Sequence, residues 1–489
     1  MKNVPQCFDG TFTFLNRTHA FGGADRVNWY VDMDDGRYQL WRANLSFMGY
    51  LCTAMDADPA RGLALAARLC ESFLTVSTFS RPSDFGDLWN SYPVSQRILA
   101  LSASLIRLPA PLADSPDRMI VDRFLRRNVA YLLQNLETEL GFNHLERNLS
   151  ALALYALAAR NTPVAVGQAI LAHFDHVVGD TIGNDGVQLE RSPMYQALVV
   201  QSQRVLREID IFTPEQRSLL DRRLASVEWA LAAMTLGDGM PAMFNDGWFG
   251  ETPATAAILP GSASPGFVVL PDAGYVRFAD GGAVALFDAG PIGPNANPGH
   301  GHPDFLSIEL TIGAERLLVD PGTSNYSAGQ ERARDRSWDQ HNGPAITGGA
   351  PVEYLGSFKV GRRAAAKLEM AEQVDGVQRA AGSLHFAGVK VSRKVTLSGA
   401  MLTLRDRWER GEGERLTRFL VPSEWRVSAS EDDSVTLTRA GSSVRITVAD
   451  ASLTFGASSW TCRYNEHFPA HEIVVRPRAD QATTTIRWG

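Results

Sequence analysis

The chain has 489 residues, of which 45% are hydrophobic and 21% are charged, and its formal net charge is −7. This length is enough for two or three domains, and the composition is that of an ordinary globular protein. The negative net charge argues against a general nucleic-acid binder, which needs a basic surface, but it allows a local basic cleft for an anionic ligand.

The first half of the sequence has the apolar spacing of helices. Segments such as PARGLALAARLCESFLTV and DRMIVDRFLRRNVAYLLQNLETEL carry apolar residues three and four apart, and several begin with a proline after a polar residue. About eight such helices with short connections favour antiparallel helical hairpins. We therefore predict a helical domain over residues 1–255, built as an incomplete α/α toroid of hairpins.

The second half changes to alternating apolar residues. Residues 256–272 are rich in Gly, Pro, Ala and Ser and are predicted to be a linker. From residue 273 onward, GYVRFADGGAVALFDAG predicts two strands around an Asp-Gly-Gly turn, and FLSIELTIGAERLLVD predicts a hairpin that turns at Gly313. We predict an antiparallel β-sandwich over residues 273–489, which makes the fold class α+β multidomain.

Cysteine usage and the N-terminus bear on the cellular compartment. The cysteines form no CxxC pair, so free buried thiols are expected. The first residues lack a basic segment followed by an apolar one, and no stretch is long and apolar enough to cross a membrane. The chain as it stands is therefore expected to be cytoplasmic, whereas a chain trimmed at its N-terminus would fit a periplasmic protein.

Polar residues gather at the starts of predicted helices. Asn143, His144 and Arg147 lie in GFNHLERNLSAL, where Asn143 has the alternative role of a helix cap. Tyr195 follows Ser192 in SPMY and could equally be a core aromatic residue.

A further segment, LWNSYPVSQRI, adds Trp89, Tyr92 and Arg97 before another predicted helix. Aromatic rings stack on sugars and arginine pairs with carboxylates, so these residues suit a sugar acid. Ordinary helix packing explains them as well.

Two of the ten histidines, His300 and His302, lie one glycine apart in NPGHGHPDF. In an extended segment this spacing puts both side chains on one face. Asp320 ends the strand that returns from the predicted turn, and His341 follows in DQHNG. Two histidines and an aspartate suit Zn²⁺. Hydrogen bonding is the more common role of a histidine pair in a loop, and an aspartate before Pro-Gly also fits a turn.

Together these stretches resemble the heparinase II/III-like polysaccharide lyases, and the resemblance covers most of the chain. That family has an N-terminal α/α toroid followed by a C-terminal antiparallel β-sandwich, in agreement with the pattern of the sequence. The segments that carry the resemblance are NHLERNLSAL (143–152), DGVQLERSPMY (185–195), GHGHPDFLSIEL (299–310), LLVDPGTSNY (317–326) and RSWDQHN (336–342).

The resemblance implies a role for each of these motifs. Tyr195 would be the general acid/base and His300 a second proton-transfer group, while Asn143 and His144 would contact the substrate carboxylate. A structural Zn²⁺ would be held by His302, Asp320 and His341. Together with Trp89, Tyr92 and Arg97 from the segment above, the residues expected to contact substrate are Arg147, Glu190, Tyr326 and Arg336.

The implied reaction is β-elimination from an anionic polysaccharide or oligosaccharide, and neither a nucleic acid nor a membrane is an expected partner. The C5 proton of a uronic acid is removed and the O4-linked sugar is expelled. Donors must stabilise the charge that develops on the carboxylate, and other groups must move the two protons. A free tyrosine has a pKa of about 10, so Tyr195 as a base needs nearby positive charge or hydrogen bonds.

Two other functions fit the same sequence. A glycoside hydrolase needs two carboxylates that flank one bond, and Glu146, Glu190 and Asp246 lie near the motifs. A non-catalytic glycan-binding or export accessory protein would bind polymer without turnover. Labelled water in the product would identify the hydrolase.

Overall fold

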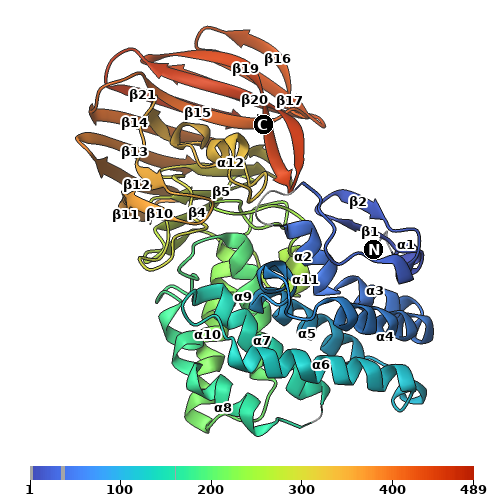
Figure 1. The fold of residues 1–489 in the computed structure, drawn as a ribbon. Coiled ribbons are helices and arrows are strands. Elements are labelled where there is room, and N and C mark those ends of the chain that lie inside the picture. Colours follow the sequence, from blue (N-terminus) through green and yellow to red (C-terminus); the bar gives the residue numbers. More distant parts are fainter. Residues whose placement is uncertain (1–3, 35–38, 160) are drawn as a thin grey trace. The chain divides into compact units, whose positions relative to one another are not determined.

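The computed structural model describes residues 4–34, 39–159 and 161–489 (Figure 1). The chain divides into two compact units, the first made of residues 1–181 and 201–224, the second of residues 182–200 and 225–489. The division falls inside the helices α9 (Pro193–Arg207) and α10 (Pro214–Ala233). It does not coincide with the predicted linker 256–272.

The first unit is mostly helical. A short helix, α1 (Val4–Phe8), precedes an N-terminal hairpin of β1 (Thr11–Phe14) and β2 (Arg17–Ala20), which the sequence patterns had not indicated. The helices that follow within residues 39–172 are α2 (Leu40–Phe47), α3 (Tyr50–Ala57), α4 (Pro59–Val76), α5 (Ser91–Ile106), α6 (Pro116–Gln134), α7 (Phe142–Ala158) and α8 (Val164–Ala172).

The proline start signals correspond to real helix ends. The side chain of Asp58 accepts a hydrogen bond from the Arg61 N–H at the start of α4, and Ser115 does the same for Arg118 at the start of α6. In both helices proline takes the first position, where no backbone donor is needed. These caps explain why the helices begin where the sequence predicts.

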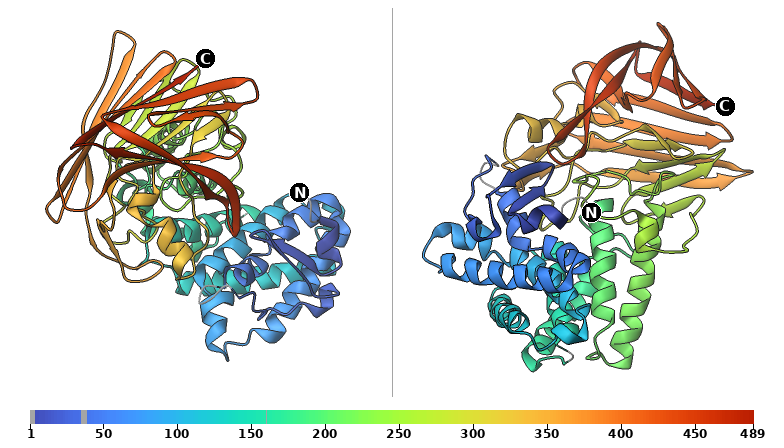
Figure 2. Two further views of the ribbon diagram at one scale, coloured as in Figure 1. Left: turned by 90° about the horizontal axis from the view of Figure 1, so that it is seen from above. Right: turned by 90° about the vertical axis from the view of Figure 1, so that its right-hand side faces the viewer.

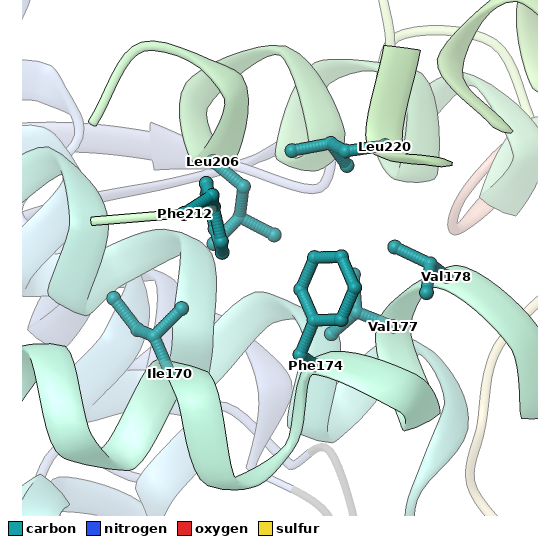
Figure 3. A pocket seen from close by; sticks show the side chains of 7 residues that line it. All are labelled: Ile170, Phe174, Val177, Val178, Leu206, Phe212 and Leu220. Carbon is teal, nitrogen blue, oxygen red and sulfur yellow. The ribbon is translucent and has the colours of Figure 1, made fainter. Parts of the chain in front are cut away.

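One continuous apolar core holds the first unit together, and it includes Trp29, Trp41 and Phe73. A small cavity in this unit is drawn in Figure 3. Every side chain that lines it is apolar, so it is a packing gap with no group that would orient a polar ligand. The lining residues are Ile170, Phe174, Val177, Val178, Leu206, Phe212 and Leu220.

The second unit is built of antiparallel sheets whose strands lie side by side in Figures 1 and 2. A five-stranded sheet has its strands in chain order, with the expected turn at Gly313 between the last two. Its strands are β3 (Val268–Leu270), β4 (Tyr275–Asp280), β5 (Ala283–Asp288), β6 (Ile308–Ile312) and β7 (Glu315–Leu318).

The largest sheet has eight strands in the order β11-β12-β13-β14-β21-β18-β17-β16. Its central strands alternate strictly between buried and accessible residues, as a sheet with one solvated face should. The strands are β11 (Ala366–Val374), β12 (Val377–Phe386), β13 (Val389–Ser398), β14 (Met401–Arg410), β16 (Arg426–Glu431), β17 (Ser434–Arg439), β18 (Ser442–Ala449) and β21 (Gln481–Trp488).

Smaller elements complete the second unit. A four-stranded sheet has the order β19-β20-β15-β8, and β9 pairs with β10. Their bounds are β8 (Pro344–Ile346), β9 (Val352–Tyr354), β10 (Val360–Arg363), β15 (Arg415–Pro422), β19 (Ala451–Arg463) and β20 (Glu466–Pro477), and a short helix, α12 (Gln330–Asp335), lies between β7 and β8.

Packing explains why the unit boundary differs from the prediction. Ala230 and Met234, from the end of α10 and the residue after it, share a small core with Tyr275 and Leu286 of the five-stranded sheet. The apolar spacing of α10 showed that it is a helix but not which core its last turn joins. The predicted linker itself contains regular structure, because α11 (Thr255–Ile258) overlaps its start and β3 lies near its end.

None of the helices in the described parts of the chain is long and apolar enough to cross a membrane.

Candidate active site

Three predicted site residues meet in the second unit. Tyr195 lies in the first turn of α9, where its backbone N–H donates to Ser192 Oγ at 3.2 Å. Its ring centroid is 4.5 Å from that of His300, which lies between β5 and β6. Its hydroxyl is 3.0 Å from the hydroxyl of Tyr326, which follows β7. The structure therefore brings together Tyr195 and His300, which can both transfer protons, and places the Tyr326 hydroxyl next to that of Tyr195.

Asp246 orients His300. Its Oδ2 is 2.8 Å from His300 Nδ1, and its Oδ1 is 2.9 Å from His302 Nε2. Arg332 pairs with both carboxylate oxygens, with Nη2 at 2.9 Å from Oδ2. Burial alone would raise the pKa of Asp246, but Arg332 and the two histidines hold it well below its usual range. An anionic Asp246 accepts the Nδ1 proton of His300 and so leaves Nε2 as the nitrogen that can exchange protons.

Backbone contacts join the His300 loop to the Asp246 loop. The Asp246 N–H donates to His300 O at 2.9 Å, and the His302 N–H donates to Asn245 Oδ1 at 2.8 Å. The glycine between the histidines is required by space, because a Cβ on Gly301 would lie 2.3 Å from the carbonyl oxygen of Ile292. Both histidine rings thus reach one carboxylate, and the loop that carries them has no room for a side chain between them.

Glu190 lies beside the free nitrogen of His300. Its Oε1 is 3.9 Å from His300 Nε2, and its Oε2 accepts a hydrogen bond from Gln188 Nε2 at 2.6 Å. The side chain is buried. Glu190 therefore places a second carboxylate beside His300, on the side of the ring away from Asp246.

Tyr326 belongs to an aromatic cluster. Its ring centroid is 5.0 Å from that of Phe358 and 5.6 Å from that of Trp248, and the Arg332 guanidinium carbon lies 5.2 Å from its ring. Burial raises the pKa of Tyr326 well above its usual range, and Tyr195 and Asp246 raise it further. Tyr326 therefore keeps its proton at neutral pH and can donate it in the hydrogen bond to the Tyr195 oxygen.

The three predicted zinc ligands also lie in this unit. His341 Nδ1 is 2.8 Å from Asp320 Oδ2, and the ring centroids of His302 and His341 are 5.7 Å apart. The remaining nitrogens, His302 Nδ1 and His341 Nε2, are buried with no hydrogen-bond partner among the described residues. Within that part of the chain, however, no three His, Cys, Asp or Glu side chains stand so that they could hold a metal ion. The donor types fit zinc, but in the structure His302 is paired with Asp246 and His341 is paired with Asp320.

In the first unit, His144 is held by a carboxylate that the sequence reading missed. Its Nδ1 is 3.0 Å from Glu137 Oε1, and its ring centroid is 5.1 Å from that of Tyr92. Asn148 Nδ2 donates to Glu137 Oε2 at 2.9 Å, and Glu137 N donates back to Asn148 Oδ1 at 2.9 Å. The i, i+4 spacing of His144 and Asn148 on one helix face was the available signal. The cap of α7 is Gly141, without a side-chain cap, so Asn143 does not have the capping role.

Two predicted substrate contacts are wrong. Trp89 and Arg97 are both fully buried in the core of the first unit. The Arg97 guanidinium donates to Asn128 Oδ1 at 3.1 Å and to the backbone oxygen of Leu88 at 2.8 Å, and it lies 4.5 Å from the Phe73 ring. An arginine among aromatic rings has the same sequence pattern in a core as in a sugar site, and here it serves the core.

Arg336 is also buried, and its donors are used within the protein. Its Nη2 donates to Gly299 O at 2.7 Å and its Nη1 to Ser357 O at 2.6 Å, while its guanidinium lies 3.9 Å from the Tyr354 ring. It therefore supports the loop that carries His300, and the predicted direct contact with substrate is not what the structure shows. Arg147 is largely buried as well.

Comparison with known proteins finds a family match over part of the chain and a similar fold over most of it. Residues 262–489 match the family described as Heparinase II/III-like, C-terminal. The fold is similar to heparan sulfate lyase HepC from Pedobacter heparinus (TM-score 0.63, 14% identity, 99% of this chain and 82% of that chain). It is similar to heparinase III (TM-score 0.74, 15% identity, 96% and 80%) and to chondroitinase AC lyase (TM-score 0.52, 11% identity, 91% and 75%). The predicted family resemblance and the predicted fold class are confirmed.

One curated protein matches on a short segment. It is a methionyl-tRNA formyltransferase from Rhizobium leguminosarum bv. trifolii, 28% identical over 149 residues. The match covers 28% of this chain, and the chain spans 47% of that protein's length. This is too little of either protein to show a family.

Proposed function

Since residues 262–489 form a heparinase II/III-like C-terminal domain, we propose that the protein is a polysaccharide lyase that cleaves a uronic-acid-containing glycan by β-elimination. The observation that carries the proposal is the cluster of Tyr195, His300 and Tyr326, in which Asp246 fixes the His300 ring. The similar folds support a glycan as the substrate.

The proposed reaction moves two protons and consumes no water. The C5–H bond breaks, its electron pair forms the C4–C5 double bond, and O4 leaves with the electrons of the C4–O4 bond and takes up a proton. Tyr195 supplies the proton to the leaving oxygen. The C5 proton lies on opposite ring faces in the two uronate epimers, so the base differs between them. For one epimer Tyr195 starts as the phenolate, takes the C5 proton and passes that same proton to O4. For the other epimer His300 Nε2 takes and keeps the C5 proton, and Tyr195 starts protonated and gives its own proton to O4.

The substrate carboxylate needs donors while negative charge develops on it. We assign this role to Asn143 and His144. Glu137 fixes the orientation of the His144 ring through Nδ1. Tyr92 and Arg147 stay candidates for contacts with the sugar.

The hydrolase alternative has less support. It requires two carboxylates that are free to act on one bond. Asp246 is occupied by Arg332 and by both histidines and is fully buried. Of the other two carboxylates named for this alternative, Glu190 lies next to His300, and Glu146 is buried within α7 of the first unit. In the second unit this leaves Glu190 beside His300, and a single carboxylate does not provide the acid and base of hydrolysis.

The test is a polysaccharide panel read by the ultraviolet absorbance of the unsaturated product. Heparan sulfate, chondroitin sulfate, hyaluronan and alginate would be offered to wild type, to Tyr195→Phe and to the control Tyr155→Phe, which changes a half-buried tyrosine outside the cluster. We expect absorbance from wild type and the control, and a loss of about 100-fold or more in Tyr195→Phe. Wild type without an unsaturated product on any polymer, or Tyr195→Phe as active as wild type, would contradict the proposal.

We propose separately that His302, Asp320 and His341 hold a structural Zn²⁺. His302 Nδ1 and His341 Nε2, which have no hydrogen-bond partner in the described part of the chain, and the adjacent carboxylate of Asp320 support this donor set. Binding requires the side chains to shift, because they are not yet arranged around one point. Metal analysis of untreated protein should find zinc, and chelation should lower the melting temperature. Metal-free protein with unchanged melting temperature would refute the site.

A further inference from the structure

A row of hydroxyl groups crosses the solvated face of the eight-stranded sheet. The strand registers pair Thr396 with Thr403, Thr403 with Thr485, Thr485 with Thr447, and Thr447 with Ser434. Five neighbouring strands, β13, β14, β21, β18 and β17, each contribute one member. The last member, Ser434, is buried at the end of the row and donates to Glu431 Oε2 at 3.0 Å. With strands about 4.8 Å apart, the row is about 19 Å long.

Cationic side chains flank this row on both sides. In the next row on one side, Lys394 lies directly opposite Arg405. In the next row on the other side, Arg487 lies directly opposite Arg445. Arg407 follows Arg405 on the same face of β14, and all five side chains are exposed. We call the hydroxyl row and these five cations the cationic face.

Few acidic groups balance these charges. In the part of the chain that the structure describes, Lys394, Arg405 and Arg407 make no side-chain hydrogen bond or ion pair. The Arg487 guanidinium contacts the sulfur of Met401 at 3.3 Å. Arg445 is the exception, because it lies 3.7 Å from Glu431.

At the outward positions of β13, β14, β21, β18 and β17, the one carboxylate is Glu409, and it pairs with Lys390.

The arrangement costs stability unless an anion binds. Like charges directly opposite each other in neighbouring strands destabilise a sheet, and the cationic face has two such pairs. The chain as a whole carries a net charge of −7, so this cluster of cations, in which Arg445 alone has an ion pair among the described residues, is not a consequence of a generally basic composition. A bound polyanion would remove the repulsion in both pairs at once.

We propose that the cationic face binds an anionic polysaccharide chain. The identity of the polymer rests on the proposed function, because the bound chain would be the one that the active site cuts. Threonine hydroxyls donate and accept, so they match sugar hydroxyls as well as sulfate or carboxylate oxygens, and the flanking arginines and lysine pair with the anionic groups.

A polysaccharide fits better than a single-stranded nucleic acid. Proteins that bind single strands stack the bases on aromatic side chains. The outward positions of β13, β14, β21, β18 and β17 contain no Phe, Tyr or Trp. The face offers charge and hydroxyl groups, but no ring on which a base could stack.

The experiment measures binding without cutting, in a Tyr195→Phe background. The test variant adds Lys394→Gln, Arg405→Gln and Arg487→Gln. The matched control adds Arg68→Gln, Arg126→Gln and Arg478→Gln, which removes the same charge from exposed positions elsewhere. Each protein is offered immobilised heparan sulfate, immobilised hyaluronan and single-stranded DNA at several salt concentrations.

We expect the test variant to lose about tenfold or more in affinity for at least one of the two polysaccharides, with a weaker salt dependence. The control should stay within about twofold of its parent. A Thr403→Val, Thr485→Val pair, which keeps charge and shape, should weaken binding by a smaller factor of about two to five. Melting temperatures of the test variant should not fall, since repulsion is removed.

Equal affinity of the test and control variants, no binding by the parent, or tighter binding of DNA than of either polysaccharide would each overturn the proposal. Its failure is distinguishable from failure of the proposed function. If the wild type makes an unsaturated product but the cationic face does not bind polysaccharide, only the proposal about the cationic face is refuted. If the cationic face binds polysaccharide but the wild type makes no unsaturated product, only the proposed lyase activity is refuted.

Discussion

Each unit of the molecule holds a histidine through its Nδ1 and a carboxylate, but the two carboxylates have different neighbours. In the second unit the Asp246 carboxylate also accepts hydrogen bonds from Arg332 and contacts His302, an arginine that is charged and a histidine that can be. In the first unit the Glu137 carboxylate also accepts a hydrogen bond from the side chain of Asn148, which is neutral. A carboxylate within a charged network keeps its negative charge when buried, which suits a histidine that moves protons. Glu137 orients its histidine with one neutral amide as its other side-chain partner, and so stands outside such a network.

Asp246→Asn tests most directly whether Asp246 and Glu137 have different roles. The amide can no longer accept the Nδ1 proton of His300 as a carboxylate does, so the ring favours the wrong tautomer and kcat should fall by about 100-fold or more. The variant also leaves the Arg332 charge unpaired, which should destabilise the fold by about 3 kcal/mol or more.

Steady-state kinetics and thermal unfolding measure the two effects of Asp246→Asn. The control is Asp272→Asn, because Asp272 is an exposed carboxylate in the second unit that accepts the Asn184 N–H. Activity of Asp246→Asn within threefold of wild type would refute the orienting role.

A second change acts on the loop. In Gly301→Ala the new Cβ would meet the Ile292 oxygen at 2.3 Å, so the loop must shift and carry His300 away from Asp246. We expect kcat to fall by about tenfold or more, because misplacement of about 1 Å can reduce catalysis strongly. Gly356→Ala is the control, since no atom lies within 4 Å of a Cβ at that position. A fully active Gly301→Ala enzyme would show that the loop tolerates displacement.

The histidine of the first unit should respond differently. Glu137→Gln keeps the shape of the side chain but removes a charge that faces His144, and its single oxygen can accept from only one of His144 and Asn148. If His144 binds the substrate carboxylate, KM should rise by about three- to tenfold with a smaller change in kcat. A fall in kcat as large as that of Asp246→Asn would mean that the two carboxylates have the same role.

Asp335 provides a third carboxylate with neutral hydrogen-bond donors, and it has a testable pH dependence. Burial raises its pKa to about 6, although Ser324 donates to it from N–H and Oγ. Because the folded-state pKa lies above the unfolded value of about 3.9, the stability that the protonated form contributes is complete below pH 4 and is lost as pH rises to about 6.

We therefore expect wild type to lose up to about 2 kcal/mol of unfolding free energy relative to Asp335→Asn between pH 4 and pH 6. Denaturant unfolding of both proteins at several pH values measures the difference. A difference that stays constant, or one that grows with pH, would contradict the raised pKa.

The smallest expected effect concerns the cationic face. Lys394→Gln removes one of the two like-charge cross-strand pairs, so it should stabilise the free protein by a few tenths of a kcal/mol at low salt. The gain should shrink as salt screens the charges. Thermal unfolding at low and high salt is the measurement, and a destabilised variant would contradict the assigned repulsion.

Local signals predicted the elements well because they depend on nearby residues. Proline after a polar cap marked the starts of α4 and α6, and alternation marked the hairpin of β6 and β7. Family resemblance supplied Tyr195 and His300, which the structure does bring together. Their catalytic roles, the zinc and the cytoplasmic location stay predictions.

What could not be predicted depends on long-range packing. Asp246 comes 54 residues before His300, and nothing in its neighbourhood showed which of the chain's carboxylates would reach the histidines. Arg97 was misassigned because burial depends on the helices around it, and its aromatic neighbours Phe73 and Trp89 suit a core and a sugar site equally.

The shared carboxylate of Asp246 also predicts strong epistasis. His300, His302 and Arg332 each depend on the same two oxygen atoms, so substitutions at these positions should not have additive effects, as is usual for residues in one network. Once one of Asp246, His300, His302 and Arg332 is replaced, the effect of a substitution at any of the other three changes. The four residues should therefore change together or stay fixed together.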